Sequence, residues 1–134
     1  MRKDINIPKV EDIGVAIVKE QNEIGQDEWK VYLLNFQKKP INNVLISSKG
    51  YGSFEGDTRK TSFFTFFIEE LAPESFKFIE LIIEEVFPLT NEYLVSYYQY
   101  GLLYDKKYIF LPESIVEENL IQIPLINKYG VLIK

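Results

Sequence analysis

The stretch from Asn91 to Leu111 constrains the fold more than any other part of this chain. It reads as two extended segments that fold back on each other at Tyr100-Gly101, and it holds six of the nine tyrosines. Aromatic residues are enriched in β-strands, where they pack well on a half-buried pleated surface. The stretch therefore predicts a β-hairpin, and it places the chain among β proteins.

Alternation sorts the aromatic side chains of this hairpin into two rows, because successive residues of a strand point to opposite faces. Tyr93 and Tyr97 share one face of the first segment. Tyr98 and Tyr100 share the other face. In the second segment the aligned residues are Tyr104, Lys106, Tyr108 and Phe110. We expect one row to be buried. The other row, if exposed, forms a Tyr-rich patch typical of protein interfaces; the alternative is cross-strand stabilisation with hydroxyls at the solvent rim.

Further strand patterns recur along the chain with short connections and no long helix between them. Asn43–Ser48 follows a turn at Gln37–Pro40 and is expected to pair with the strand before that turn. The predicted strands outside the Tyr-rich hairpin include Val10–Lys19, Trp29–Phe36, Asn43–Ser48 and Thr61–Leu71. About seven strands of this kind predict an all-β fold, an antiparallel β-sandwich of immunoglobulin-like architecture with little helix. The chain has 134 residues, which is the usual size of a single domain, so we expect one domain over residues 1–134.

Two segments have less clear patterns. Ala72–Phe87 has charged residues at helical spacing, but its apolar pairs and flanking prolines favour a strand followed by a turn. Lys49–Lys60 contains three glycines and is predicted to be a long irregular loop. A long loop inside a compact domain often carries function.

Composition excludes several classes of site. The chain contains no cysteine and no histidine, which removes disulfides, ordinary zinc sites and histidine-based catalytic triads. Its net charge is −5, so nucleic acid and anionic membranes are disfavoured as partners. No run approaches the roughly 18 apolar residues of a membrane span, and residues 1–10 lack the apolar region of a signal peptide. We expect a cytoplasmic protein without a membrane partner.

No catalytic, cofactor or metal site is predicted. The paired carboxylates Glu69-Glu70, Glu84-Glu85 and Glu117-Glu118 are adjacent in sequence, so the members of each pair point to opposite faces of a strand and form no acid/base dyad. Glu55 and Asp57 alone do not make a calcium loop. We therefore expect a non-catalytic protein; an enzyme would need a pocket with a perturbed carboxylate or lysine.

Lys49-Gly50-Tyr51-Gly52 agrees with the opening of an RNA-recognition motif whose aromatic residues stack on bases. The agreement ends at Ser53, where a stacking aromatic residue is needed. The two helices of that fold are missing as well. The simpler interpretation is a glycine-rich segment at the point where the chain leaves a strand.

Binding residues are predicted at two places. Arg59 and Lys60 could hold an anion at the Lys49–Lys60 loop, although solvated charge that limits edge aggregation is the plainer role. The full set of predicted binding residues is Tyr51, Phe54, Arg59 and Lys60 from the loop, and Tyr98, Tyr100 and Tyr104 from the Tyr-rich hairpin.

The chain also resembles a group of short, uncharacterised bacterial proteins typical of the Bacteroidetes. The resemblance spans nearly the whole length and is carried by Lys3-Asp4-Ile5, Ile7-Pro8-Lys9-Val10, Trp29-Lys30-Val31-Tyr32-Leu33, Lys49-Gly50-Tyr51, Lys60-Thr61-Ser62 and Leu103–Phe110. Proteins of this group sometimes carry the label phenylalanyl-tRNA synthetase alpha subunit. No residue here matches the arginine motifs with which such a synthetase grips ATP, so the resemblance implies no catalytic residue.

Two functions follow as hypotheses. The first is a non-catalytic binding module that engages another protein or a second copy of itself. The second is an accessory factor linked to tRNA or to phenylalanyl-tRNA synthetase, without aminoacylation activity of its own.

Overall fold

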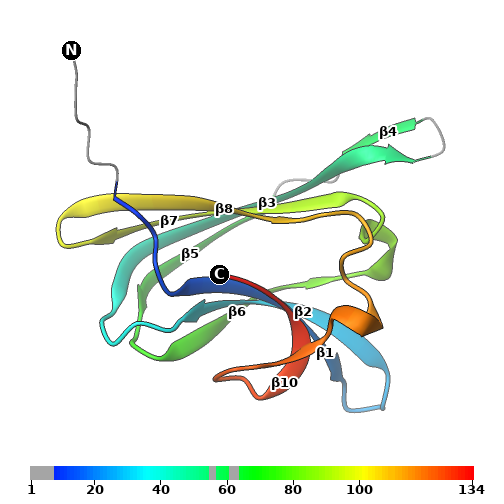
Figure 1. Cartoon of the computed structure of the whole chain (residues 1–134), viewed down its shortest axis with the longest axis horizontal. Helices are drawn as coiled ribbons and strands as arrows, with labels where there is room; N and C mark the ends of the chain where they lie inside the picture. Colours follow the sequence, from blue (N-terminus) through cyan, green and yellow to red (C-terminus); the bar gives the residue numbers. More distant parts are fainter. Residues whose placement is uncertain (1–7, 55–56, 61–63) are drawn as a thin grey trace.

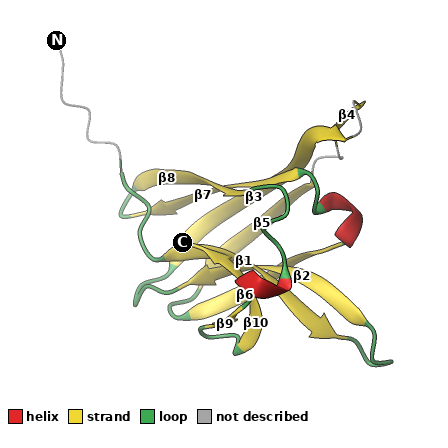
Figure 2. Cartoon of the chain, turned by 45° about the vertical axis from the view of Figure 1, so that its right-hand side comes forward, coloured by secondary structure: helices red, strands yellow, loops and turns green. Residues whose placement is uncertain are grey.

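The chain forms two antiparallel sheets that pack face to face (Figure 1). The computed structural model describes the backbone of residues 8–54, 57–60 and 64–134, and the side chains of residues 8–52 and 64–134. Within these ranges it contains ten strands and two short 3-10 turns (Figure 2). The predicted all-β sandwich with little helix is confirmed, with ten strands in place of about seven. The immunoglobulin-like arrangement stays a prediction.

The first sheet has the strand order β6-β2-β1-β10-β9. Strand β2 lies between β6 and β1. Both of its faces carry buried apolar side chains, as the sequence predicts, and this suits a central strand. β1 and β2 remain paired out to Gln21 and Asp27, beyond the predicted strand ends at Lys19 and Trp29. The strands of this sheet are β1 (Ile13–Gln21), β2 (Asp27–Asn35), β6 (Ser75–Ile82), β9 (Ile121–Ile123) and β10 (Lys128–Ile133).

The second sheet is organised around β3, which pairs β7 along one edge and β5 and β4 along the other. The expectation that Asn43–Ser48 pairs with Trp29–Phe36 is wrong, because the chain crosses to the opposite sheet after the turn at Gln37–Pro40. The strands of this sheet are β3 (Ile41–Phe54), β4 (Asp57–Lys60), β5 (Phe64–Leu71), β7 (Thr90–Gln99) and β8 (Leu102–Phe110).

The predicted loop at Lys49–Lys60 is also wrong for its described residues. Residues 49–54 continue β3, and Asp57–Lys60 form β4, with Tyr51 opposite Lys60. Glycine weakens a strand but does not prevent it where neighbouring strands accept and donate the backbone hydrogen bonds. Figure 1 shows β4 and the end of β3 projecting beyond the rest of the sandwich.

The Tyr-rich hairpin is confirmed as β7 and β8. The turn residues Tyr100 and Gly101 have φ angles of 57° and 73°, the left-handed pair that a two-residue type I′ turn requires. Tyr93, Tyr97 and Tyr108 of the inward row are buried. One aromatic row is therefore core, as the alternation predicts.

The main core lies between the two sheets, and a smaller one covers the outer face of the first sheet. Ile13, Val15 and Ile17 of β1 point into the main core. Ala16 and Val18 point the other way, into the smaller core. The smaller core is completed by Tyr32, Leu34 and Ile123, with Phe36, Leu125, Ile126 and Leu132 packed against them.

The segment Ala72–Phe87 forms a strand and then a turn, as predicted. Strand β6 ends at Ile82, and a 3-10 turn, η1 (Glu84–Val86), follows. A second 3-10 turn, η2 (Glu117–Asn119), precedes β9.

Gly130 of β10 has to be glycine because β1 approaches it closely. It pairs with Val18, and a Cβ atom there would overlap the carbonyl oxygen of Ile17 and lie 2.9 Å from the Cα of Val18. Both are backbone atoms, which cannot move aside without disturbing the ladder.

We expect Gly130→Ala to lower the free energy of unfolding by about 2–3 kcal/mol, the usual cost of an overpacked core site. Gly14→Ala is the matched control. Its added Cβ would meet the flexible end of Leu132 at 3.0 Å and come no closer than 3.2 Å to a backbone atom, the oxygen of Ile133, so it should cost less, about 1 kcal/mol. Urea unfolding of the three proteins measures the difference. Equal destabilisation by the two substitutions would contradict this account of Gly130.

Candidate functional site

The predicted binding tyrosines of the hairpin do not lie on one surface. Tyr98 is 47% exposed on the outer face of the second sheet. Tyr104 points inward and stacks on the ring of Tyr97 at 5.1 Å. Tyr100 occupies the turn, with the Lys39 ammonium 5.0 Å from its ring centre. Of these three, Tyr98 alone belongs to the outer sheet face.

The predicted residues near the β3–β4 hairpin are only partly described. The side chains of Phe54, Arg59 and Lys60 lie outside the described residues. Tyr51 is half-buried, and its hydroxyl lies 3.4 Å from a carboxylate oxygen of Glu92. The Lys49 ammonium lies 3.7 Å from the same carboxylate. Tyr51 therefore contacts an ion pair of its own sheet.

Four large apolar side chains meet on the outer face of the second sheet, and we call them the outer-face patch: Leu45, Phe67, Tyr98 and Leu103. They are 43%, 57%, 47% and 50% exposed, respectively. Leu45 pairs with Phe67, and Tyr98 pairs with Leu103. Ser96 lies opposite Leu45 and two residues from Tyr98, so the two pairs are diagonal neighbours within reach of each other. Sequence reasoning identified Tyr98 and missed the other three. Leu45 and Phe67 were missed because β3 was assigned to the wrong partner strand.

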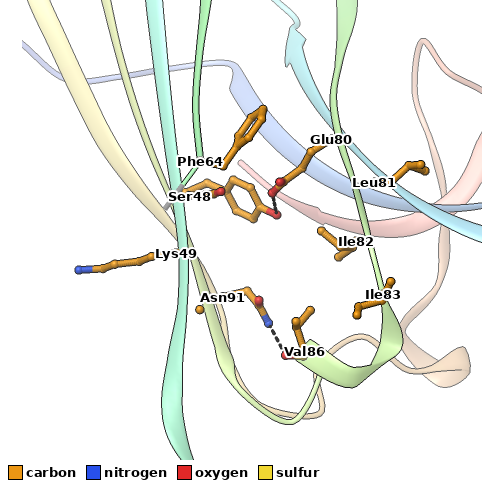
Figure 3. Close-up of a pocket in the computed structure, with 11 residues that line it drawn as sticks. Ser48, Lys49, Phe64, Glu80, Leu81, Ile82, Ile83, Val86 and Asn91 are labelled. Carbon is orange, nitrogen blue, oxygen red and sulfur yellow. Dashed lines mark hydrogen bonds between the residues drawn. The ribbon is translucent and has the colours of Figure 1, made fainter. Parts of the chain in front are cut away.

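A pocket of about 370 Å³ opens between the two sheets, and we call it the intersheet pocket. It lies between β6 with its following turn and the inner faces of β3, β5 and β7. Figure 3 shows Ser48, Phe64 and Glu80 gathered on one side of it, whereas Lys49 points away. The remaining lining residues are Gly50, Leu81, Ile82, Ile83, Val86, Asn91 and Tyr93.

A β-bulge turns Glu80 into this pocket. Phe78 pairs with Tyr32 on the outer face of the first sheet, and Glu80 pairs with the inward residue Val31, so Ile79 is an extra residue in β6. Bulges of this kind redirect side chains and are frequent next to functional sites. Regular alternation would have placed Glu80 outward with Phe78, and no glycine or proline marks the bulge, so the sequence offered no signal for it.

The Glu80 carboxyl is held in an environment that favours its neutral form. The Tyr93 hydroxyl donates a hydrogen bond of 2.9 Å to it. Burial raises the pKa of Glu80 above its ordinary value, although hydrogen bonding from Tyr93 and Ser48 opposes the shift. Burial also raises the pKa of Tyr93, so this phenol stays protonated and donates. The pair can hold or release a proton, and the carboxylate can accept a cation.

Glu20 shows the opposite behaviour on the outer face of the first sheet. Burial raises the pKa of Glu20, but hydrogen bonds from Lys128 and Tyr32 outweigh it and leave the pKa below its ordinary value. The Lys128 ammonium lies 2.7 Å from its carboxylate, and the Tyr32 hydroxyl lies 2.5 Å away. Glu20 is thus a paired structural charge.

Other kinds of site are missing from the described part of the chain. No group of three or more carboxylates there could hold a metal ion. No helix there is long and apolar enough to span a membrane.

Comparison of the chain with protein-family models, with curated proteins and with solved structures gave no match.

The raised pKa of Glu80 has a consequence for stability. The folded protein binds the Glu80 proton more tightly than the unfolded chain does, so ionising this carboxyl costs stability as pH rises above its ordinary pKa. We expect Glu80→Gln, which cannot ionise, to be more stable than the wild type at pH 7. The advantage should shrink as pH falls toward 4.

Urea unfolding of both proteins between pH 4 and pH 8 measures this difference. Glu85→Gln, which removes an exposed carboxylate of the following turn, is the control for the change in net charge. A Glu80→Gln advantage that is constant or grows toward low pH would contradict the assignment.

Proposed function

We propose that this chain is a non-catalytic cytoplasmic module that binds another protein on the outer face of its second sheet. The observation that carries the proposal is the outer-face patch, in which four neighbouring large apolar side chains are each at least 43% exposed. Large side chains rarely form a contiguous exposed apolar patch on a soluble protein, and where they do the patch commonly marks a protein interaction site. Aromatic residues such as Phe67 and Tyr98 are enriched at such interfaces.

The charges around the patch favour a different protein over a second copy. Glu70 lies opposite Asn42 at one border, and Asp105 lies opposite Ser96 at the other. Lys107 is a basic residue two positions from Asp105 on β8, and the net charge of the whole chain is −5. Two copies would bring like charges together, which costs association rate and affinity. A partner with an apolar contact surface and a lysine- or arginine-rich rim is complementary.

We expect the double substitution Phe67→Ser with Leu103→Ser to weaken partner binding by about tenfold or more, since truncated interface anchors commonly cost over 1 kcal/mol. Both side chains are exposed, so the fold should persist. Ile24→Ser, which removes an apolar side chain that is 77% exposed in the β1–β2 connection, is the matched control and should bind normally.

The measurement has two parts. A partner captured by the wild-type chain is purified and titrated against the three proteins by calorimetry at low and moderate salt. Light scattering then gives the oligomeric state of the chain alone. Undiminished binding by the double variant would overturn the proposal, and a dimer that the double variant dissociates would make a second copy the occupant.

The alternative function, an accessory factor linked to tRNA or to phenylalanyl-tRNA synthetase, has one observation in its favour. Lys49 and Tyr51 lie on a strand, as the RNA-recognition pattern requires, and share its outer face. Against it, Tyr51 and Lys49 are engaged by the Glu92 carboxylate.

We expect no binding of tRNA in a filter assay at low salt, because the net charge of −5 repels phosphate. Binding that weakens steeply as salt is added, and that Tyr51→Ala abolishes, would favour the RNA-linked function over the protein-binding one.

A further inference from the structure

The buried and half-buried carboxylates of this protein differ in how their charge is balanced. Glu20 has Lys128 at 2.7 Å, and Glu92 has Lys49 at 3.7 Å. No lysine or arginine among the described side chains forms an ion pair with Glu80. Its neighbours are the hydroxyls of Tyr93 and Ser48. An ionised carboxylate in such a place lacks the cation that usually accompanies a buried charge.

We propose that the intersheet pocket binds a small organic cation, a primary ammonium with a short apolar chain, whose charged group pairs with Glu80. This site is separate from the outer-face patch, because it lies between the sheets and the patch lies on the outer face of one of them.

The carboxylate has room for such a partner. An ionised carboxyl offers about four lone-pair positions. The Tyr93 hydroxyl occupies one of them, and hydrogen bonding from Ser48 also contributes. Glu80 is half-buried and lines an open pocket, so its remaining positions are reachable from solvent. A primary ammonium has three donors, and charge-assisted hydrogen bonds to a carboxylate are among the strongest in proteins.

The walls of the pocket suit the rest of the ligand. Ile82 and Val86 supply aliphatic surface beside Glu80, and Phe64 supplies an aromatic ring (Figure 3). Aromatic faces attract ammonium groups, and aliphatic walls remove an alkyl chain from water. At about 370 Å³, the pocket lies at the small end of the range for ligand sites and has room for an ammonium with a short alkyl chain.

The same geometry disfavours anions and neutral polar molecules. An anion would meet the Glu80 carboxylate. Lys49 points away from the pocket (Figure 3), and its ammonium lies 3.7 Å from the Glu92 carboxylate. A neutral alcohol can hydrogen-bond but leaves the buried charge without compensation.

The test uses n-butylammonium as probe, with n-butanol and butyrate as the neutral and anionic comparisons. Binding to the full chain is followed at pH 7 by calorimetry and by NMR shifts of the Phe64 and Tyr93 rings. We expect saturable binding of n-butylammonium and weaker or absent binding of the other two. Glu80→Gln should weaken ammonium binding by about tenfold or more, the worth of one charge-assisted hydrogen bond.

Two controls separate recognition by Glu80 from general attraction to an acidic protein. Glu85→Gln changes the net charge equally but lies outside the pocket lining, and it should bind n-butylammonium as the wild type does. Wild-type affinity should also rise with pH as Glu80 loses its proton, and this rise should vanish in Glu80→Gln. No saturable binding, equal binding of n-butanol, or undiminished binding by Glu80→Gln would each overturn the proposal.

Discussion

The structure depends on burying a row of tyrosines between its two sheets. Tyr93, Tyr97 and Tyr108 are each at most 2% exposed, and their rings fill the core as phenylalanine would. Their hydroxyls, however, cost free energy unless they find a hydrogen-bond partner. Tyr108 donates to the backbone oxygen of Ile13 at 2.7 Å, which ties the second sheet to the first. Tyr93 donates to Glu80. The aromatic core thus supplies a hydrogen-bond donor to the carboxyl group that the bulge in β6 turns inward.

Alternation was enough to predict the part of the fold in which strands run regularly. The hairpin at Tyr100-Gly101 and the burial of one of its two aromatic rows follow from a period of two and a turn that needs left-handed residues. Which row is buried, and hence that Tyr98 is exposed, came only from the structure. Alternation did not predict the partner of β3, because long-range packing decides which sheet a strand joins. The glycines of Lys49–Lys60 indicated a loop. Instead, the end of β3 pairs with β4 on one side and with β7 on the other.

The candidate sites were harder to predict than the fold for a related reason. The outer-face patch needs Leu45 to lie beside Phe67 and near Tyr98, and this follows only from the correct strand order. Glu80 faces the core because Ile79 is an extra residue, and a single-residue shift reverses every side chain beyond it. A sequence without glycine or proline at that place gives no sign of such a shift. Both sites therefore depend on register, which local pattern does not determine.

The position of Glu80 links stability to ligand binding. Its ionised form is disfavoured by burial, so the folded protein at neutral pH carries a cost that a glutamine would not. A cation that binds the carboxylate removes this cost in the folded state and has no comparable site in the unfolded chain, so it stabilises the fold by mass action. Sites that sacrifice stability for function behave in this way, because the group that weakens the free protein is the group that recognises the ligand. The contrast with Glu20, whose lysines already balance its charge, indicates that the chain can neutralise a buried carboxylate where only structure is at stake.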